Sequence, residues 1–349
     1  MSRRWLWLLL WCLAGAAWAG RGTDLPEGVE LPMRVRLAVR VLNITAMREV
    51  SGQVRLHLET TQRWHDPRLV FDAVRAGSQR IDRVGDEAQA YIRQIWTPGL
   101  LADNRIGEMQ SHSLAVSVHA NGEVQLVERY ESDFRVAMNL AAFPFDRQQP
   151  TLSFSLPRYP KQEAILVANE RERRYSGIAA ILSVADWRGM GMDFFGDETT
   201  GWNAQHYSRL NTTLHLERLS ERYILRIFIP IITVLAVSIY ILWAPALQAK
   251  DKGSIVFSSL LALAAISFTF EASFPGSISL NTPVAQMISL GYVYLVLVLL
   301  VDSVLAPACE NLDAPRHALH IRIRQQVRWL LPAVMFVVCA GAALRAIPV

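Results

Sequence analysis

Four long runs of apolar residues fill the last third of this chain. A helix of about 20 apolar residues crosses the roughly 30 Å hydrocarbon core of a membrane, and each run is long enough to do so: 223–247, 253–274, 283–305 and 327–347. Residues 20–222 contain no comparable run. The pattern therefore predicts a domain outside the membrane over residues 20–222, followed by a transmembrane domain of four helices over residues 223–349.

Residues 1–19 have the pattern of a secretory signal peptide. Arg3 and Arg4 precede an apolar stretch, and the small residues Ala17 and Ala19 end it. We expect cleavage before Gly20, so that the mature chain begins outside the cytoplasm.

Basic residues indicate the orientation of the helices, because Lys and Arg favour the cytoplasmic side of short loops. The loop between the second and third runs has no charge. The basic residues lie between the first and second runs and before the fourth: Lys250, Lys252, Arg316, Arg322, Arg324 and Arg328. Both observations place the large domain and the C-terminus outside the cytoplasm.

Composition narrows the function classes. The net charge of +4 is spread along the chain without a dense basic run, which disfavours nucleic-acid binding. Cys12 leaves with the signal peptide, and Cys309 and Cys339 lie beside or within membrane runs. The external domain therefore has no disulfide, and its own apolar core must hold it together.

Short runs of alternating apolar and polar residues recur in the external domain, as in Val35 to Val41, Val54 to Leu58 and Leu210 to Leu216. Such alternation indicates half-buried strands, and many of them predict an all-β sandwich of the immunoglobulin-like type with about ten strands. Asn121-Gly122 predicts a hairpin turn. A short helix is expected over Asp86 to Arg93.

Enzyme and metal chemistry find little support. His57 and Glu59 share one strand face, and His215 and Glu217 share another, but no paired metal-ligand spacing occurs. The chain has no nucleophile elbow, phosphate-binding glycine loop or dinucleotide fingerprint. We expect no enzymatic activity, metal or cofactor.

The second run carries a stripe of residues on one helical face, because its members are three or four residues apart. These residues, called the stripe below, are Ser254, Ser258, Leu261, Ala265, Phe268 and Ala272. Hydroxyls occupy its first half and apolar groups the rest. Such a face suits the wall of a pore formed by several copies, or equally a close helix-packing surface.

Several motifs occur in a characteristic order along the chain: Trp64-His65-Asp66-Pro67-Arg68-Leu69, then Trp96-Thr97-Pro98, then Phe143-Pro144-Phe145-Asp146-Arg147-Gln148, then Pro230 and Pro275 in the membrane part. With these motifs the chain resembles the pentameric ligand-gated ion channels, or Cys-loop receptors, and in particular their bacterial members. Three positions depart from the family pattern. Val136 and Pro150 stand where animal receptors have the paired cysteines, and Gly99 replaces an aspartate.

The resemblance implies a homopentamer in the bacterial inner membrane, embedded in lipid and with its external domain periplasmic or extracellular. Five second helices would surround a pore for inorganic ions, and the family's pore-facing positions fall on the stripe. A narrow apolar ring blocks ions until it widens, so Leu261 and Phe268 are the expected gate. A non-conducting membrane receptor or solute-binding protein with the same fold is the alternative.

Charges at both ends of the stripe bear on ion selectivity. Asp251 falls where cation-selective members of the family carry an acidic ring, and Glu271 near the outer mouth would also concentrate cations. Lys250 and Lys252 flank Asp251 and complicate this interpretation. We expect cation conduction.

The resemblance also implies a charged cluster between the external domain and the membrane. Glu49, Asp146 and Arg218 occupy those places, and Pro275 begins the segment that would receive the motion. Three independent surface charges are the alternative interpretation.

The agonist site of the family lies between subunits. Its positions fall on or near Glu59, Asp103, Tyr159, Trp202 and Tyr207. Acids beside aromatic rings would suit a small cationic ligand, a divalent ion, or protons acting through carboxyls of raised pKa. These alternatives remain open.

Overall fold

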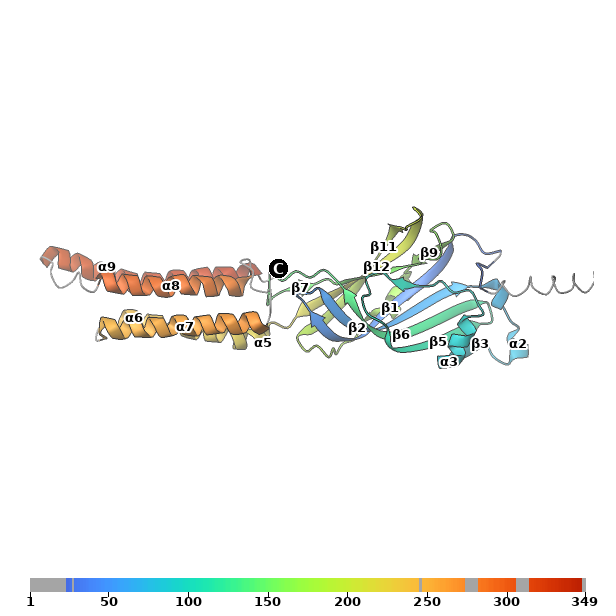
Figure 1. Cartoon of the computed structure of the whole chain (residues 1–349), viewed down its shortest axis with the longest axis horizontal. Coiled ribbons are helices and arrows are strands. Elements are labelled where there is room, and N and C mark those ends of the chain that lie inside the picture. Colours follow the sequence, from blue (N-terminus) through green and yellow to red (C-terminus); the bar gives the residue numbers. More distant parts are fainter. Residues whose placement is uncertain (1–22, 27, 245–246, 274–281, 306–313, 347–349) are drawn as a thin grey trace, which may run out of the picture.

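The computed structural model describes residues 23–26, 28–244, 247–273, 282–305 and 314–346. A β-domain occupies one end of an elongated molecule and a bundle of long helices the other (Figure 1). The predicted signal peptide, Pro275 and the loop after it lie outside the described residues.

Two β-sheets form the external domain, which confirms the predicted sandwich. The described residues contain twelve strands rather than about ten, because β4, β7 and β10 have two residues each, too few to show alternation. The strands are β1 (Met33–Arg48), β2 (Gln53–His65), β3 (Arg80–Val84), β4 (Leu101–Ala102), β5 (Gln110–His119), β6 (Glu123–Arg135), β7 (Arg147–Gln148), β8 (Thr151–Ser155), β9 (Ala164–Val167), β10 (Gly177–Ile178), β11 (Trp187–Thr200) and β12 (His206–Arg218).

One sheet has the order β10-β1-β2-β6-β5-β3, with β9 also paired to β1, and the other has β11-β12-β8-β4, with β7 paired to β12. Alternate residues of each long strand face the space between the sheets. Large side chains such as Trp64, Trp96, Phe134 and Phe154 are fully buried there. This apolar core holds the domain together without a disulfide.

Turns and short helices connect the strands. Asn121 and Gly122 join β5 to β6, and Gly122 has φ of +79°, a conformation that favours glycine. This confirms the predicted hairpin. The short helices are η1 (Pro67–Leu69), α2 (Ala73–Ala76), α3 (Gly85–Ile92) and α4 (Glu170–Tyr175). The helix expected over Asp86 to Arg93 corresponds to α3.

The membrane part begins with α5 (Glu221–Tyr223), which continues through a π-helical segment (Ile224–Phe228) into α6 (Ile229–Trp243). Then come α7 (Ala249–Ser273), α8 (Pro283–Leu305) and α9 (Ala314–Ala346). In the described residues, three helices contain stretches long and apolar enough to cross a membrane: Lys250–Ala272, Pro283–Val304 and Ile321–Ala342.

Three helix ends differ from the sequence expectation. The first helix stops at Trp243 instead of reaching 247, and the second starts at Ala249 instead of 253. The last helix starts at Ala314, thirteen residues before the expected 327. Its first turns are rich in Arg and Gln, which form helices well but do not register as apolar. Hydropathy thus located the membrane-crossing part and missed the polar extension.

The long helices pack in a defined order. The pore-helix candidate α7 packs mainly against α6 and α8, whereas α9 packs mainly against α8 and to a lesser extent α6. Figure 1 shows α7 and α9 at different sides of the bundle. One face of α7 therefore remains uncovered by its own chain.

Candidate pore and gating site

The uncovered face of α7 includes the predicted stripe. All six stripe residues are exposed in the single chain, with Leu261 65% and Phe268 77% exposed. Val256, Leu263 and Phe270, on the other side of the helix, are buried in the bundle. The stripe is therefore not a packing surface within this chain.

Charged residues at the two ends of α7 have different surroundings. Lys250, Asp251 and Glu271 are exposed. Lys252 is buried, and its Nζ lies 2.9 Å from Oδ1 of Asp302 on α8. Of the two lysines that flank Asp251, one is thus directed into the bundle and neutralised by a carboxylate.

The structure brings the predicted junction charges together. Arg218 donates from Nε to Oδ1 of Asp146 at 2.7 Å, and its Nη2 donates to Oδ2 of Asp146 at 3.2 Å and to Oε1 of Glu49 at 3.1 Å. A further bond at 3.2 Å joins Arg218 to the hydroxyl of Tyr223. The side chains of Arg218 and Asp146 are each only 1% exposed. They are therefore not independent surface charges.

Aromatic rings enclose the Arg218 guanidinium, whose central carbon lies 4.2 Å from the ring centre of Trp187 and 4.8 Å from that of Phe143. Burial alone would lower the pKa of Arg218. The hydrogen bond and charge of Asp146 outweigh burial and raise that pKa above its ordinary value. The guanidinium is therefore a permanent positive charge held in a dry, aromatic site.

Phe143 connects this cluster to the membrane helices. Its ring centre lies 5.2 Å from that of Tyr223 and 5.7 Å from that of Phe270 on α7. Phe145, two residues further along the same loop, lies 6.0 Å from Phe228. The loop that carries Asp146 therefore rests directly on the outer end of the bundle.

The five predicted ligand residues have separate surroundings in the described chain. Glu59 is buried and binds Arg40 at 3.1 Å and Arg129 at 2.5 Å, so both its carboxylate oxygens are already engaged. Asp103 accepts a hydrogen bond from Ser155. Burial raises the pKa of Asp103, although Ser155 and the charge of Arg209 act against this rise.

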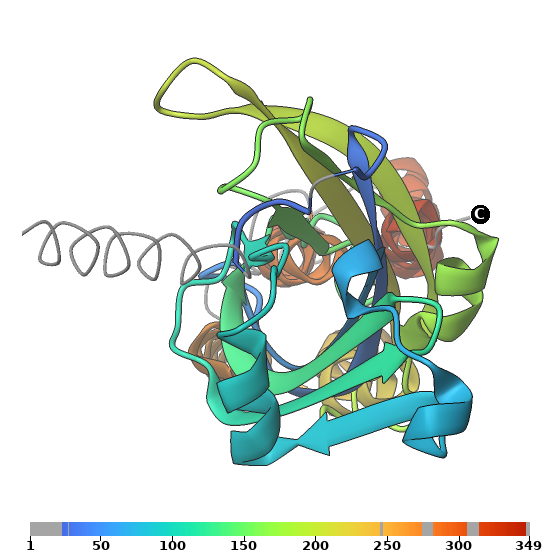
Figure 2. The ribbon, with the colours of Figure 1, turned by 90° about the vertical axis from the view of Figure 1, so that its right-hand side faces the viewer.

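The three aromatic members have different partners. Tyr159 packs against Trp96, with 5.3 Å between the two ring centres. Tyr207 is buried and hydrogen-bonded to Asn203. Trp202 is 98% exposed in the turn between β11 and β12. Figure 2 shows this hairpin, in yellow-green, extending beyond the rest of the domain. Within the single chain, each predicted ligand residue thus has its own surroundings.

A group that the sequence reasoning missed lies on the inner face of β6. Oε2 of Glu128 accepts a hydrogen bond from Gln62 at 3.0 Å, and Oε1 of Glu128 lies 3.8 Å from Nε2 of His112. Burial raises the pKa of Glu128, against the opposing effects of His112, Gln62 and Arg105. A signal existed in the sequence, because Glu128 interrupts the apolar positions Leu126 and Tyr130 of an alternating strand.

An external β-sandwich joined through a buried charge cluster to a bundle of long apolar helices defines a multi-pass membrane protein with an extracellular ligand-binding domain. Residues 24–220 match the model of the neurotransmitter-gated ion-channel ligand binding domain. The chain therefore belongs to the family of pentameric ligand-gated ion channels. This family is not enzymatic.

Two relatives are both named for their response to protons. The chain is 24% identical over 249 residues to pH-sensitive chloride channel 2 of Anopheles gambiae, which covers 67% of this chain but 39% of that protein. It is 22% identical over 266 residues to the proton-gated ion channel of Gloeobacter violaceus, covering 72% of this chain and 67% of that protein. The chain thus spans well under half the length of the first relative.

Proposed function

We propose that this chain is the subunit of a homopentameric, ligand-gated ion channel of the bacterial inner membrane, in which five copies of α7 line the pore. The observation that carries the proposal is the stripe, which is polar and then apolar and which its own chain leaves uncovered. An intramembrane face of this kind needs either water or copies of itself as a neighbour. A five-fold arrangement supplies both.

Each part of the stripe has its own role in this proposal. The hydroxyls of Ser254 and Ser258 replace part of an ion's hydration shell near the cytoplasmic end. Leu261, Ala265 and Phe268 form apolar rings that expel water when the pore is narrow. Leu261 is the first gate residue and Phe268 the second.

We propose cation selectivity from the charges at the ends of the pore. The exposed Asp251 and Glu271 form acidic rings, whereas the charge of Lys252 is neutralised by Asp302. The exposed Lys250 remains as an opposing charge. One relative is named as a chloride channel, so reversal potentials in NaCl gradients are the deciding measurement. A shift toward the chloride potential would overturn cation selectivity while leaving the channel proposal intact.

Protons are the agonist that we propose first, since both relatives are named for pH or proton sensitivity. Asp103 and the half-buried Glu128 have raised pKa values, so mild acidification neutralises them before ordinary surface carboxyls. The Glu59 carboxylate is already ion-paired with Arg40 and Arg129. A small cationic ligand bound between subunits near Tyr159, Trp202 and Tyr207 is the other agonist to test.

The junction cluster of Glu49, Asp146 and Arg218 is proposed to transmit the agonist signal. Arg218 ties the last strand of the external domain to the loop that carries Phe143. Phe143 in turn contacts α7 through Phe270. Movement of the sheet therefore has a short, packed route to the outer end of the pore helix, and Pro275 would receive it there.

Recording from oocytes or from liposomes that contain the purified chain tests the channel proposal. Steps to acidic pH should evoke currents. In a background with Cys309 and Cys339 replaced by alanine, a charged methanethiosulfonate reagent should block Ser258→Cys. Ser303→Cys, exposed on α8, is the matched control and should not be blocked. Intact pentamers without current under any pH or small-amine condition would instead support a non-conducting receptor.

A further inference from the structure

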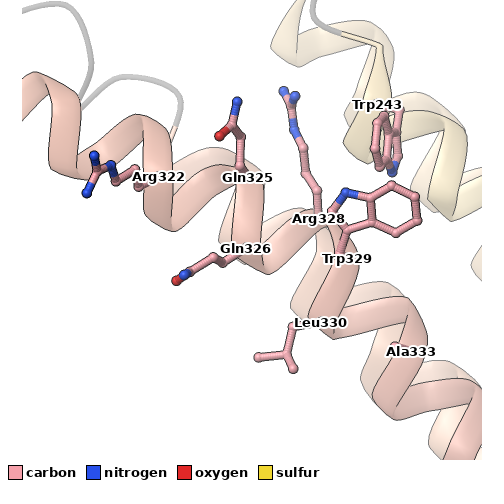
Figure 3. A pocket seen from close by; sticks show the side chains of 8 residues that line it. All are labelled: Trp243, Arg322, Gln325, Gln326, Arg328, Trp329, Leu330 and Ala333. Carbon is pink, nitrogen blue, oxygen red and sulfur yellow. The ribbon is translucent and has the colours of Figure 1, made fainter.

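A pocket of about 340 Å³ lies at the start of β1, in the external domain. β1 has 16 residues and ends next to Glu49 of the junction cluster, so at about 3.3 Å per residue the pocket lies about 50 Å from that cluster. It is also separate from a larger groove among the membrane helices, where Figure 3 shows Trp243 and Trp329 beside each other. The lining of the pocket includes apolar and basic side chains and one acid: Leu31, Pro32, Arg34, Arg36, His65 and Glu30.

Strand geometry gathers the basic side chains on one face. Met33, Val35 and Leu37 point into the core, so Arg34 and Arg36 point away from it. The antiparallel register places Arg36 opposite Arg63 of β2. Two residues further along the strands, Arg34 and His65 come to the next row of the same face. Like charges that lie opposite each other destabilise a sheet, so this arrangement calls for anions beside it.

The first of these two rows has its anions within the chain. Arg63 donates to the buried carboxylate of Glu172 on α4 at 3.1 Å. Arg36 lies 3.5 Å from Oε1 of Glu123, and Arg171 lies 3.9 Å from the same oxygen. The charge of Glu123 is therefore already shared between two guanidinium groups.

The second row has no such anion. Across the residues that the structure describes, the side chains of Arg34 and His65 form neither an ion pair nor a hydrogen bond. Glu30 lines the same pocket but is exposed and does not pair with Arg34. The guanidinium of Arg34 is thus available to an anion from outside the chain, and its planar fork fits the two oxygens of a carboxylate.

The other lining residues narrow the kind of anion. Leu31 is 53% exposed and Pro32 is exposed, so an apolar surface adjoins the guanidinium. The negative charge of Glu30 disfavours an anion with several charges. A volume of about 340 Å³ is at the lower end of the range of small-molecule pockets. A singly charged carboxylate with a small apolar body meets all three conditions.

We infer that this pocket binds a small monocarboxylic acid, with its carboxylate on Arg34 and its apolar body against Leu31 and Pro32. Asn169, also in the lining, immediately precedes α4, which Glu172 fastens to β2. The occupant therefore bridges the start of β1 and the start of α4. This inference depends neither on ion conduction nor on the identity of the agonist.

Chemical footprinting of arginine tests the inference at the residue concerned. Phenylglyoxal reacts with accessible guanidinium groups, and mass spectrometry of the solubilised full-length protein gives the modification rate of each arginine. Benzoate is the probe. Benzamide has the same ring without the charge, and acetate has the same charge without the ring. Arg75, whose side chain is 89% exposed on α2, is the control within each sample.

Benzoate at about 10 mM should slow the modification of Arg34 by about tenfold, the effect of a dissociation constant on the order of 1 mM. Arg75 should react at an unchanged rate. Benzamide and acetate at the same concentration should each slow Arg34 by less than about twofold, because each lacks one of the two contacts. Leu31→Ser should reduce the protection by benzoate to that by acetate, whereas Val74→Ser, at a position 90% exposed on α2, should retain it.

Four results would each overturn the inference. Equal protection of Arg34 by benzoate and benzamide would remove the need for a charge, and equal protection by benzoate and acetate would remove the need for an apolar body. Absence of protection by benzoate would exclude the site. An Arg34 that does not react in the protein without benzoate would show that the pocket is closed to small molecules.

Discussion

Removing the Arg218 guanidinium is the sharpest perturbation of the junction. Arg218→Ala leaves Asp146 in a site where its side chain is 1% exposed, with one hydrogen bond from Gln148 at 2.6 Å and, among the described residues, no other ion pair. An uncompensated buried charge of this kind costs about 3–5 kcal/mol. The variant also loses the stacking of Arg218 on Trp187 and Phe143. We expect the unfolding free energy of the external domain to fall by that amount.

The assay is guanidinium unfolding of the solubilised full-length protein, followed through its tryptophan fluorescence, for Arg218→Ala, Asp146→Asn and the double variant. The double variant should lose less than the sum of the single losses, because Asp146→Asn removes the charge that Arg218→Ala strands. Losses that add to within about 0.5 kcal/mol would refute the coupling. Arg147→Ala is the matched control, since its ion pair with Glu217 is half exposed and should contribute below about 1 kcal/mol.

Three further predictions concern the pore, a turn and a buried acid. Leu261→Ser should increase the open fraction at a given pH in single-channel records, since a hydroxyl ring keeps the constriction wet; unchanged activation would count against this gate. Gly122→Ala should lower the free energy of unfolding by at least about 2 kcal/mol, because φ is +79° and the added Cβ would lie 2.8 Å from the Asp66 carbonyl oxygen. Gly77→Ala should lower it by about 1 kcal/mol, because φ is +65° there but the added Cβ meets open space. Burial raises the pKa of Glu128, so the stability of the folded protein is greatest with this carboxyl neutral at low pH and declines as pH rises through the raised pKa. Glu128→Gln should therefore raise the melting temperature at neutral pH and leave it unchanged in acid, and an equal change at both pH values would contradict this reasoning.

Local patterns predicted what depends on neighbouring residues in the chain. Alternation located β1, β2 and β12, and Asn121-Gly122 located a hairpin, because side-chain period and turn preference are properties of short segments. The stripe followed from helical period in the same way. These signals could not identify the strands of two residues or the polar start of α9.

Contacts between distant segments were harder to predict. The pairing of Lys252 with Asp302 joins residues fifty positions apart, and nothing in the spacing of either residue specifies the other. Arg218, Asp146 and Glu49 were grouped only through the family resemblance. Trp202 was predicted as a ligand residue, and in the single chain its side chain is 98% exposed.

The two ends of α7 are held by interactions of different strength. At the cytoplasmic end, the buried Lys252 donates to Asp302 at 2.9 Å, and breaking such a pair strands a charge at a cost of about 3–5 kcal/mol. At the outer end, Phe270 meets Phe143 through a tilted ring contact at 5.7 Å, and such aromatic pairs contribute about 0.5–1.5 kcal/mol and tolerate sliding. A force that arrives through the Arg218 cluster therefore displaces the outer end more readily than the base, so α7 tilts about Lys252. Spin labels introduced at Ala272 should change their inter-subunit distance on acidification more than labels at Ser254, and equal changes at both positions would exclude a pivot at the base.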